Sequence, residues 1–232
     1  MRKLAKKLKD ETAELEEDMV DVRQDDKTIR KFTIPTQDIV GEIVKISAVK
    51  VIHNHEPFIK EFNKVVRQRT HLLVTGPNGV GKSTFLRSLV SDKNEQAKIL
   101  AGTRVGYYSQ DFSNLDFSQT VFDSLSGALP EGGDTQTMRS VAAGFLIHGE
   151  LMGRKVSELS EGQKGLLSFA RLQLMRPGLL ILDEPTNHIN FRHLPIIAQA
   201  INNYSGAIIM VSHMSDFVKQ IKFDETLDLG KV

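Results

Sequence analysis

One stretch of this chain decides its fold, and it reads Gly76-Pro77-Asn78-Gly79-Val80-Gly81-Lys82-Ser83-Thr84. An apolar run at residues 72–74 precedes it and predicts a strand, and residues 85–90 follow it and predict the first turns of a helix. Three glycines of the stretch have no Cβ, so the backbone can turn tightly and come close to a ligand. In this strand–loop–helix setting, the pattern G-x-x-x-x-G-K-[ST] predicts a phosphate-binding loop.

The chemistry of this loop favours the phosphates of a nucleotide bound with Mg²⁺. Consecutive backbone N–H groups form a concavity that suits an anion, and the positive end of the following helix adds to the attraction. Lys82 can reach the β- and γ-phosphates, and the hydroxyl of Ser83 can ligate Mg²⁺. The alternative is a glycine-rich turn that carries a lysine by chance, and the flanking strand and helix argue against it.

Composition bounds the class of protein. The 232 residues allow one large domain or two small ones, and a hydrophobic content of 40% suffices for a core. A formal net charge of +1 gives no overall attraction to nucleic acid or membranes. The absence of cysteine excludes disulfides and thiolate metal sites. No apolar run reaches about 18 residues, so no membrane-spanning helix is expected, and the basic start lacks the apolar core of a secretory signal.

Residues 1 to about 27 differ from the rest, because they are almost all charged residues mixed with Ala, Leu, Met and Val. Apolar and small residues recur there at alternating spacings of three and four, which predicts one helix with a heptad seam. We favour one arm of a helical hairpin or coiled coil whose partner helix is not in this sequence. The alternative is a solvated helix that packs this seam on its own domain. The seam consists of Ala5, Leu8, Thr12, Leu15, Met19 and Val22.

The remaining chain alternates between strand and helix patterns, which predicts an α/β class. Residues 28–34, 39–52 and 58–66 are β-rich, and short strands are expected at 97–100 and 105–110. Residues 115 to about 157 are helical in pattern, interrupted by a loop at 130–134. A further helix is predicted at 160–175, followed by a buried strand at 179–182, a helix at 194–203 and a second buried strand at 207–211.

Two acids, Asp183 and Glu184, end the first of these buried strands. Ligands bind at the C-terminal edge of parallel strands, so Asp183 is placed to hold Mg²⁺ and Glu184 to orient and deprotonate an attacking water. Successive side chains of a strand point to opposite faces, so these two roles require the chain to turn at once. Residues 185–187 supply that turn. The alternative, two acids that merely solvate a turn, is common for an isolated Asp-Glu pair.

Three further residues say little when each is taken alone. Ser160 precedes a helix and is a plausible N-cap. His213 follows the second buried strand, where it could reach a γ-phosphate, although a lone histidine is more often structural. Gln110 ends a short predicted strand.

Taken together and in order, these segments resemble an ABC-type ATPase domain. Residues 76–84, Gln110, residues 159–163, residues 182–185 and His213 are similar to the family's phosphate loop, Q-loop, signature, acidic motif and switch histidine. The resemblance implies a P-loop fold of the ABC ATPase type, with a β-rich N-terminal subdomain, a parallel-sheet core and a helical subdomain at about 115–175 that carries the signature. The expected division is a charged heptad helix and connector at 1–37 and the ATPase domain at 38–232.

A narrower resemblance is to the ABC-F subfamily, whose members are soluble and act on the ribosome. It rests on Leu182-Asp183-Glu184-Pro185-Thr186-Asn187-His188-Ile189-Asn190 and on residues 144–147 and 171–177. The heptad helix is similar to the second arm of the linker between the two ATPase domains of such proteins. The chain therefore looks like the C-terminal half of an ABC-F protein. This implies a cytoplasmic translation factor or ribosome-protection (antibiotic-resistance) protein, and contact with ribosomal RNA through the full-length parent.

The same resemblance implies the site residues and the cofactors, ATP and Mg²⁺. Two domains would pack head to tail around two ATP molecules, as a homodimer or with a missing N-terminal half. Glu184, His213 and Gln110 would be catalytic, and Ser83, Gln110 and Asp183 would hold the metal. All of Gly76, Pro77, Asn78, Gly79, Val80, Gly81, Lys82, Ser83 and Thr84 would bind the nucleotide, His53 would stack on adenine, and Ser160, Glu161, Gly162 and Gln163 would act in trans.

Three departures from the family pattern keep other functions open. Glu161 stands where glycine is usual in the signature, Asn190 replaces the usual aspartate of the D-loop, and His53 stands where tyrosine is usual. One alternative is the ATP-binding subunit of a membrane transporter, which the core motifs fit equally well. Another is a nucleotide-dependent dimerisation switch with little hydrolysis, although the retained Glu184 argues against it.

Overall fold

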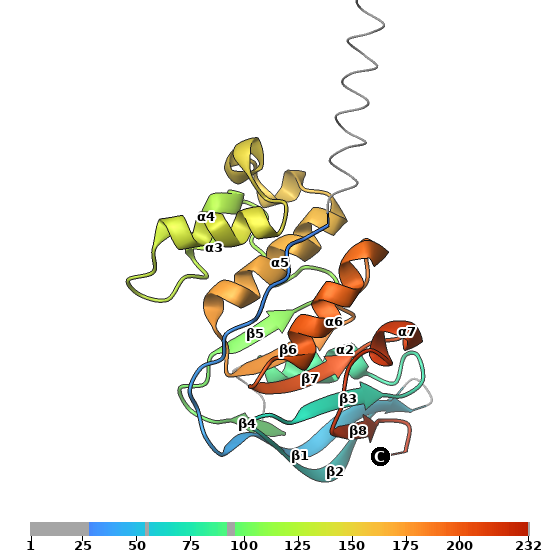
Figure 1. Cartoon of the computed structure of the whole chain (residues 1–232). Coiled ribbons are helices and arrows are strands. Elements are labelled where there is room, and N and C mark those ends of the chain that lie inside the picture. The colour runs from blue at the N-terminus through green and yellow to red at the C-terminus, as the bar shows by residue number, and fades with distance from the viewer. Residues whose placement is uncertain (1–27, 54–55, 92–95, 232) are drawn as a thin grey trace, which may run out of the picture.

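A computed structural model of the chain describes residues 28–53, 56–91 and 96–231, which form two sheets and the helices around them (Figure 1). The predicted heptad helix over residues 1–27 lies outside the described residues. The predicted α/β class, with a parallel-sheet core, a β-rich N-terminal part and a helical part, is confirmed.

The central sheet is parallel and has the order β5-β6-β7-β3-β8. Its strands β6 and β7 are buried over their whole length, as apolar runs in the middle of a parallel sheet should be. The chain runs through β3 (His71–Thr75), β5 (Val105–Tyr108), β6 (Leu179–Asp183), β7 (Ala207–Val211) and β8 (Glu225–Asp228). The edge strand β8 was not predicted from sequence.

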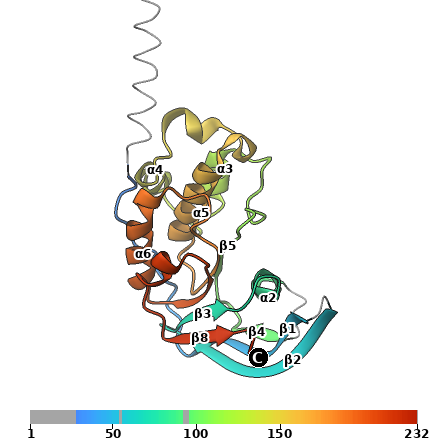
Figure 2. The ribbon, with the colours of Figure 1, turned by 90° about the vertical axis from the view of Figure 1, so that its right-hand side faces the viewer.

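A smaller antiparallel sheet has the order β2-β1-β4 and comprises β1 (Glu42–His53), β2 (Glu56–Arg67) and β4 (Ala97–Ile99). Helix α2 (Lys82–Leu89) contacts strands of both sheets (Figure 2). Alternate residues of β6 explain this layering, because Leu179 and Ile181 pack in one core with β1 and α2, whereas Leu180 and Leu182 pack in the other. The β-rich segments predicted at 39–52 and 58–66 are thus confirmed within a few residues.

The second core lies under two long helices, α5 (Glu161–Met175) and α6 (Leu194–Asn202), on the opposite face of the central sheet. Helices α3 (Val121–Ser126) and α4 (Thr135–Gly144) pack against α5 farther from the sheet (Figure 1). The loop predicted at 130–134 separates α3 from α4 and ends at Asp134, whose carboxylate caps α4. The prediction that the helical segment continues beyond α4 to about residue 157 was wrong, since only the short 3₁₀ turns Gly149–Gly153 and Val156–Glu158 form there.

Residues 28–37, which we call the strap, correct another prediction. They are extended but pair with no strand among the described residues, and they run along α5 and α6 (Figure 1). The amide of Arg30 donates to the carbonyl of Gly144 (2.9 Å), and that of Gln37 donates to the carbonyl of Pro177 (3.1 Å). The ring of Phe32 meets that of Phe145 edge-on, with centroids 4.7 Å apart. Alternation of apolar and polar residues here reflects packing on helices, so it did not make a strand.

The last elements are the 3₁₀ turn Phe191–His193 before α6 and the short helix α7 (Ser215–Val218), which was not predicted. Across the part of the chain that the structure describes, no helix combines the length and the apolarity needed to cross a bilayer.

Candidate functional site

A cavity of about 490 Å³ opens at the C-terminal edge of the central sheet, where the phosphate loop, Glu184 and the end of the second buried strand meet, and Asp183 lies outside its wall. Its walls come from five separate segments of the chain, brought together by the parallel strand order. Nine of the predicted site residues line it together with three that were not predicted. The walls are formed by Ile52, Asn78, Gly79, Gly81, Lys82, Ser83, Thr84, Gln110, Glu184, Asn187, Val211 and His213.

The phosphate loop has the backbone shape that its glycines permit. Gly81, the N-cap of α2, has φ of 105°, and Gly76 has φ of 139°, both conformations that side chains disfavour. A Cβ on Gly81 would lie 3.3 Å from the carbonyl oxygen of Lys50 in β1. The loop therefore needs glycine at both positions for its turn, and at Gly81 also for its packing against β1 of the smaller sheet.

Lys82 lies beneath the loop rather than in open solvent. Its Nζ donates to the carbonyl oxygens of Gly76 (2.8 Å) and Pro77 (3.0 Å). Burial lowers the pKa of Lys82, and the carboxylates of Glu184 and Asp183 oppose that shift. An ammonium group held at the centre of the loop can contact any phosphate that the loop's N–H groups bind.

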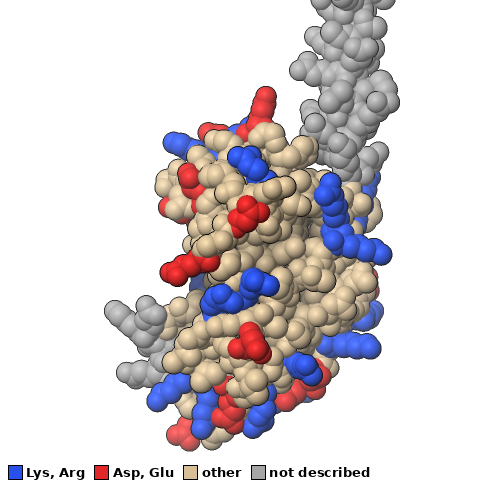
Figure 3. Space-filling model, turned by 60° about the vertical axis from the view of Figure 1, so that its left-hand side comes forward, with Lys and Arg blue, Asp and Glu red and all other residues tan. Residues whose placement is uncertain are grey.

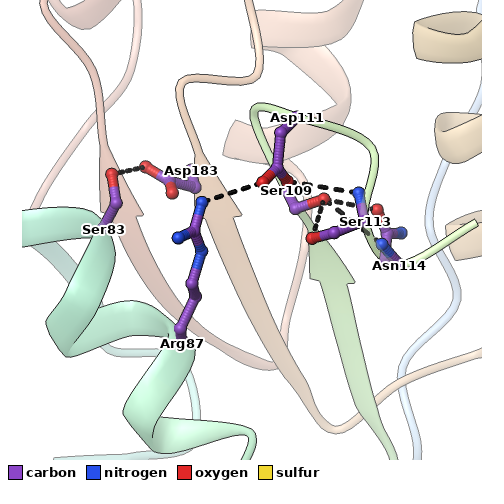
Figure 4. Close-up of polar contacts among 7 residues, drawn as sticks. All are labelled: Ser83, Arg87, Ser109, Asp111, Ser113, Asn114 and Asp183. Atoms are coloured by element: carbon purple, nitrogen blue, oxygen red, sulfur yellow. Dashed lines mark hydrogen bonds and ion pairs between the residues drawn. The ribbon is translucent and has the colours of Figure 1, made fainter.

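Asp183 and Ser83 form a pair suited to a hard cation. The hydroxyl of Ser83 donates to Oδ1 of Asp183 over 3.0 Å, joining α2 to the end of β6 (Figure 4). Asp183 is fully buried, and burial raises the pKa of its carboxyl. Its Oδ2 has no hydrogen-bond partner among the described residues. A buried carboxylate oxygen in need of a partner, beside a hydroxyl, fits the all-oxygen coordination of Mg²⁺.

Glu184 turns away from Asp183, as the sequence argument required. Its φ of 48° is left-handed, so the chain leaves the strand direction immediately after Asp183. The side chain is 6% exposed, and its Oε2 accepts a hydrogen bond of 3.0 Å from the amide of His213. The Nε2 of His213 lies 3.4 Å from Oε1 of Glu184. The two acids thus face different partners, with Glu184 and His213 side by side in the cavity wall.

Gln110 reaches the cavity from a turn and not from a strand. Strand β5 ends at Tyr108, two residues earlier, so the predicted strand at 105–110 was too long. The turn is held by the hydroxyl of Ser109, which donates to Oδ1 of Asn114 (2.7 Å), and by Nδ2 of Asn114, which donates to the carbonyl of Tyr107 (2.8 Å).

The signature residues lie elsewhere. Ser160 caps α5 in a capping box, in which its Oγ accepts from the amide of Gln163 (3.2 Å) and its amide donates to Oε1 of Gln163 (3.0 Å). Ser160, Gly162 and Gln163 line a second cavity, of about 590 Å³, which they share with Asn190. Within one chain, these residues therefore do not line the cavity of the phosphate loop.

Glu161, the unusual residue of the signature, pairs with the acidic-motif segment of its own chain. Its Oε2 lies 2.7 Å from Nδ1 of His188. His188 has φ of 67°, and its carbonyl oxygen would lie 3.1 Å from a Cβ placed on Gly162. The start of α5 and the turn after Glu184 are therefore in direct contact.

His53 ends β1, but its side chain lies outside the described residues, so its stacking role stays a prediction. Sequence reasoning missed Ile52, which lines the cavity because its amide donates to the carbonyl of Val80 over 3.0 Å. It also missed Asn187 as a wall residue. Neither carried a signal, since an apolar strand end and an asparagine in a turn are both ordinary.

Comparison with known proteins defines the class. Residues 59–187 match the family described as ABC transporter. The ATP-binding protein YbiT of Escherichia coli O157:H7 is 36% identical over 71% of this chain and 32% of its own length. ATP-binding cassette sub-family F member 3 of Mus musculus is 35% identical over 66% of this chain and 22% of its own length. The chain therefore belongs to the ABC transporter family and forms its nucleotide-binding ATPase domain.

A solved structure agrees on the fold. MJ0796, a bacterial ABC transporter cassette solved as a dimer, superposes with a TM-score of 0.60 over 81% of this chain and 95% of that one, at 19% identity. The chain spans about a third or less of the length of the two sequence relatives.

Proposed function

We propose that this chain binds ATP with Mg²⁺ and hydrolyses it in a site that a second ATPase domain completes. The observation that carries the proposal is that the phosphate loop and Glu184 line one cavity, with the buried carboxylate of Asp183 next to Ser83 of that cavity. Ser83 hydrogen-bonds to Asp183, and Glu184 lies against His213. This arrangement has the parts that phosphoryl transfer to water needs: a phosphate cradle, a cation site and a base.

The chain's own residues divide the work. Loop amides and Lys82 would hold the phosphates, and Ser83, Asp183 and Gln110 would hold the cation, which would offset the negative charge of the phosphates. Glu184 takes a proton from the attacking water while the oxygen of that water forms a bond to the γ-phosphorus. The bond from that phosphorus to the bridging oxygen breaks, and ADP leaves. The amide of His213 fixes the carboxylate of Glu184, and its imidazole is available to the γ-phosphate.

The second domain would supply Ser160, Glu161, Gly162 and Gln163. Three of these residues line a separate cavity in their own chain, which supports a role in trans. The second domain is either another copy of this chain or the N-terminal half of a longer protein. We place the start of the ATPase domain near residue 38 and its helical subdomain at about 115–175.

We further propose that the parent protein is of the ABC-F type and acts on the ribosome in the cytoplasm, as a translation factor or in ribosome protection. Sequence similarity supports this, through residues 182–190 and the 35% identity with a sub-family F protein. On the face shown in Figure 3, basic and acidic side chains are interspersed. The proposal of ribosome binding therefore depends on sequence similarity and not on a surface patch of one charge. The ATP-binding subunit of a transporter is the second candidate, favoured by the family match itself.

Glu184→Gln tests the enzymatic proposal. The amide keeps the shape of the side chain but cannot take a proton, so turnover should fall at least about 100-fold while ATP binding persists. Sedimentation velocity with ATP and Mg²⁺ should then show a dimer, and Lys82→Ala, which loses a phosphate contact, should remain monomeric. Hydrolysis at the parent rate by Glu184→Gln would refute the assignment of the base. Cosedimentation of Glu184→Gln with ribosomes, compared with flotation on membranes, separates the two candidate partners.

A further inference from the structure

The turn that carries Gln110 has a second connection to the nucleotide site, besides Gln110 itself. Asp111 projects from this turn toward α2, and its Oδ2 accepts a hydrogen bond of 2.9 Å from Nη2 of Arg87 (Figure 4). Its other oxygen, Oδ1, accepts from the amide of Ser113 over 3.2 Å. Asp111 is therefore fixed inside the turn by one oxygen and tied to the helix by the other.

Helix α2 presents Arg87 and Ser83 on one face, because residues four apart lie one above the other. Ser83 contacts Asp183 at the end of β6, and Arg87 contacts Asp111 beyond the end of β5. Lys82 of the phosphate loop opens the same helix. Helix α2 thus connects the phosphate loop, the pair of Ser83 and Asp183, and the turn that carries Gln110.

The turn is stiff enough to transmit such a constraint. Beyond the bonds of Ser109 and Asn114 already described, the amide of Phe112 donates to the carbonyl of Ser109 (3.2 Å). The ring of Phe112 packs edge-on against that of Tyr108, with centroids 6.1 Å apart, and so anchors the turn to β5. A displacement of Asp111 would therefore move Gln110, its neighbour in sequence.

The pair is exposed enough that the fold does not depend on it. The side chains of Arg87 and Asp111 are 53% and 50% exposed, and an ion pair at that exposure adds little to stability. Removing the pair should therefore change the position of the Gln110 turn relative to α2 while the domain stays folded.

We propose that Arg87 and Asp111 are a positioning pair that sets the distance of Gln110 from the cation and phosphate groups held by α2. This inference rests on the proposed function, because it assigns the pair to the Mg²⁺-dependent part of nucleotide binding. Neither residue touches the reacting atoms, and both act through Gln110.

The test measures binding of a fluorescent ATP analogue to the full chain, first in EDTA and then over a range of Mg²⁺ concentrations. Arg87→Ala and Asp111→Asn should each raise the Mg²⁺ concentration for half-maximal binding by about threefold to tenfold, while affinity in EDTA changes less than about twofold. The double variant should be no worse than either single one. The exchange Arg87→Asp with Asp111→Arg should recover part of the loss. Asp216→Asn, which breaks an exposed ion pair with Lys219, is the matched control and should match the parent.

Gln110→Ala decides whether the pair acts through Gln110. In that background, Arg87→Ala should have no further effect on the Mg²⁺ dependence. An equal loss in both backgrounds, or no loss in the parent background, would overturn the positioning role even if the chain binds ATP with Mg²⁺ as proposed. A parent chain that binds no nucleotide would instead overturn the proposed function, and the role of the pair with it.

Discussion

Replacing Asp183 with asparagine should stabilise the chain when no Mg²⁺ is present. Asp183 is fully buried, its Oδ1 accepts a hydrogen bond from Ser83, and its Oδ2 has no hydrogen-bond partner among the described residues. A buried polar atom without a partner costs roughly 1–3 kcal/mol, and a charged one costs more. Asparagine keeps the size of the side chain and its bond with Ser83, but removes the charge. We expect the free energy of unfolding to rise by about 1–2 kcal/mol in EDTA at pH 7.5, which for a domain of this size is about 3–6 °C in Tm.

The pH dependence has a definite sign. Burial, followed by the charge of Glu184, raises the folded-state pKa of Asp183 above its ordinary value of 3.8. Between that value and the raised pKa, the folded state binds more protons than the unfolded state, so stability falls as pH rises through this window. Above the window the full cost of the charged form is present. The advantage of Asp183→Asn should therefore be greatest near neutral pH and shrink as pH falls toward 4.

Thermal and urea unfolding in EDTA measure this difference, with Asp38→Asn as control. Asp38 is exposed, so its replacement should change stability by less than about 0.5 kcal/mol. Addition of Mg²⁺ and ATP should reverse the order. A ligand at 100 times its Kd adds about 2.7 kcal/mol to the parent, and Asp183→Asn should lose most of that gain. If Asp183→Asn is no more stable than the parent in EDTA at pH 7.5, the fold compensates this charge and the reasoning is wrong.

Two further results are expected. Phe32→Ala should lower the free energy of unfolding by about 2–3 kcal/mol in urea denaturation, because the half-buried ring contacts Phe145 and Phe169. The control Phe191→Ala should lower it by less than about 0.5 kcal/mol, because Phe191 is 74% exposed. Equal losses in the two variants would contradict the packing role of the strap. Burial, aided by the charge of Arg192, lowers the pKa of His193 below 6.5. The contribution of neutral His193 to stability should therefore be fully present above pH 6.5 and decrease below it, because acid protonates this histidine in the unfolded state first. His193→Gln should lose less stability between pH 7.5 and pH 5.5 than the parent, and an equal loss in both would refute this.

Much of the structure around the nucleotide site is determined by residues that are close together in the sequence. The glycines at 76, 79 and 81 permit positive φ values that the loop adopts, and the short apolar runs at 179–182 and 207–211 form the buried strands that they predicted. Ser160 and Gln163 carry a capping box in their sequence spacing, and the structure forms it. These features depend on residues within a few positions of one another, so a sequence determines them without knowledge of the rest.

Other features depend on partners far along the chain. Residues 28–34 of the strap were wrongly predicted as β-rich, because a strand needs a neighbour to pair with and this segment meets helices instead. Strand β8 was missed, since it has only four residues, Glu225–Asp228, and its pairing with β3 is not local. The helical pattern past α4 gave only 3₁₀ turns.

The candidate site shows the same division. The sequence by itself determined the phosphate loop, the turn at Glu184 and the residue types able to bind phosphate, hold a cation and accept a proton. Only the tertiary structure placed Ser83 beside Asp183, 100 residues away, and Glu184 beside His213, and it alone showed the contact of Arg87 with Asp111. The reason is physical: local sequence fixes backbone conformation and side-chain chemistry, whereas the order of parallel strands decides which strand ends meet.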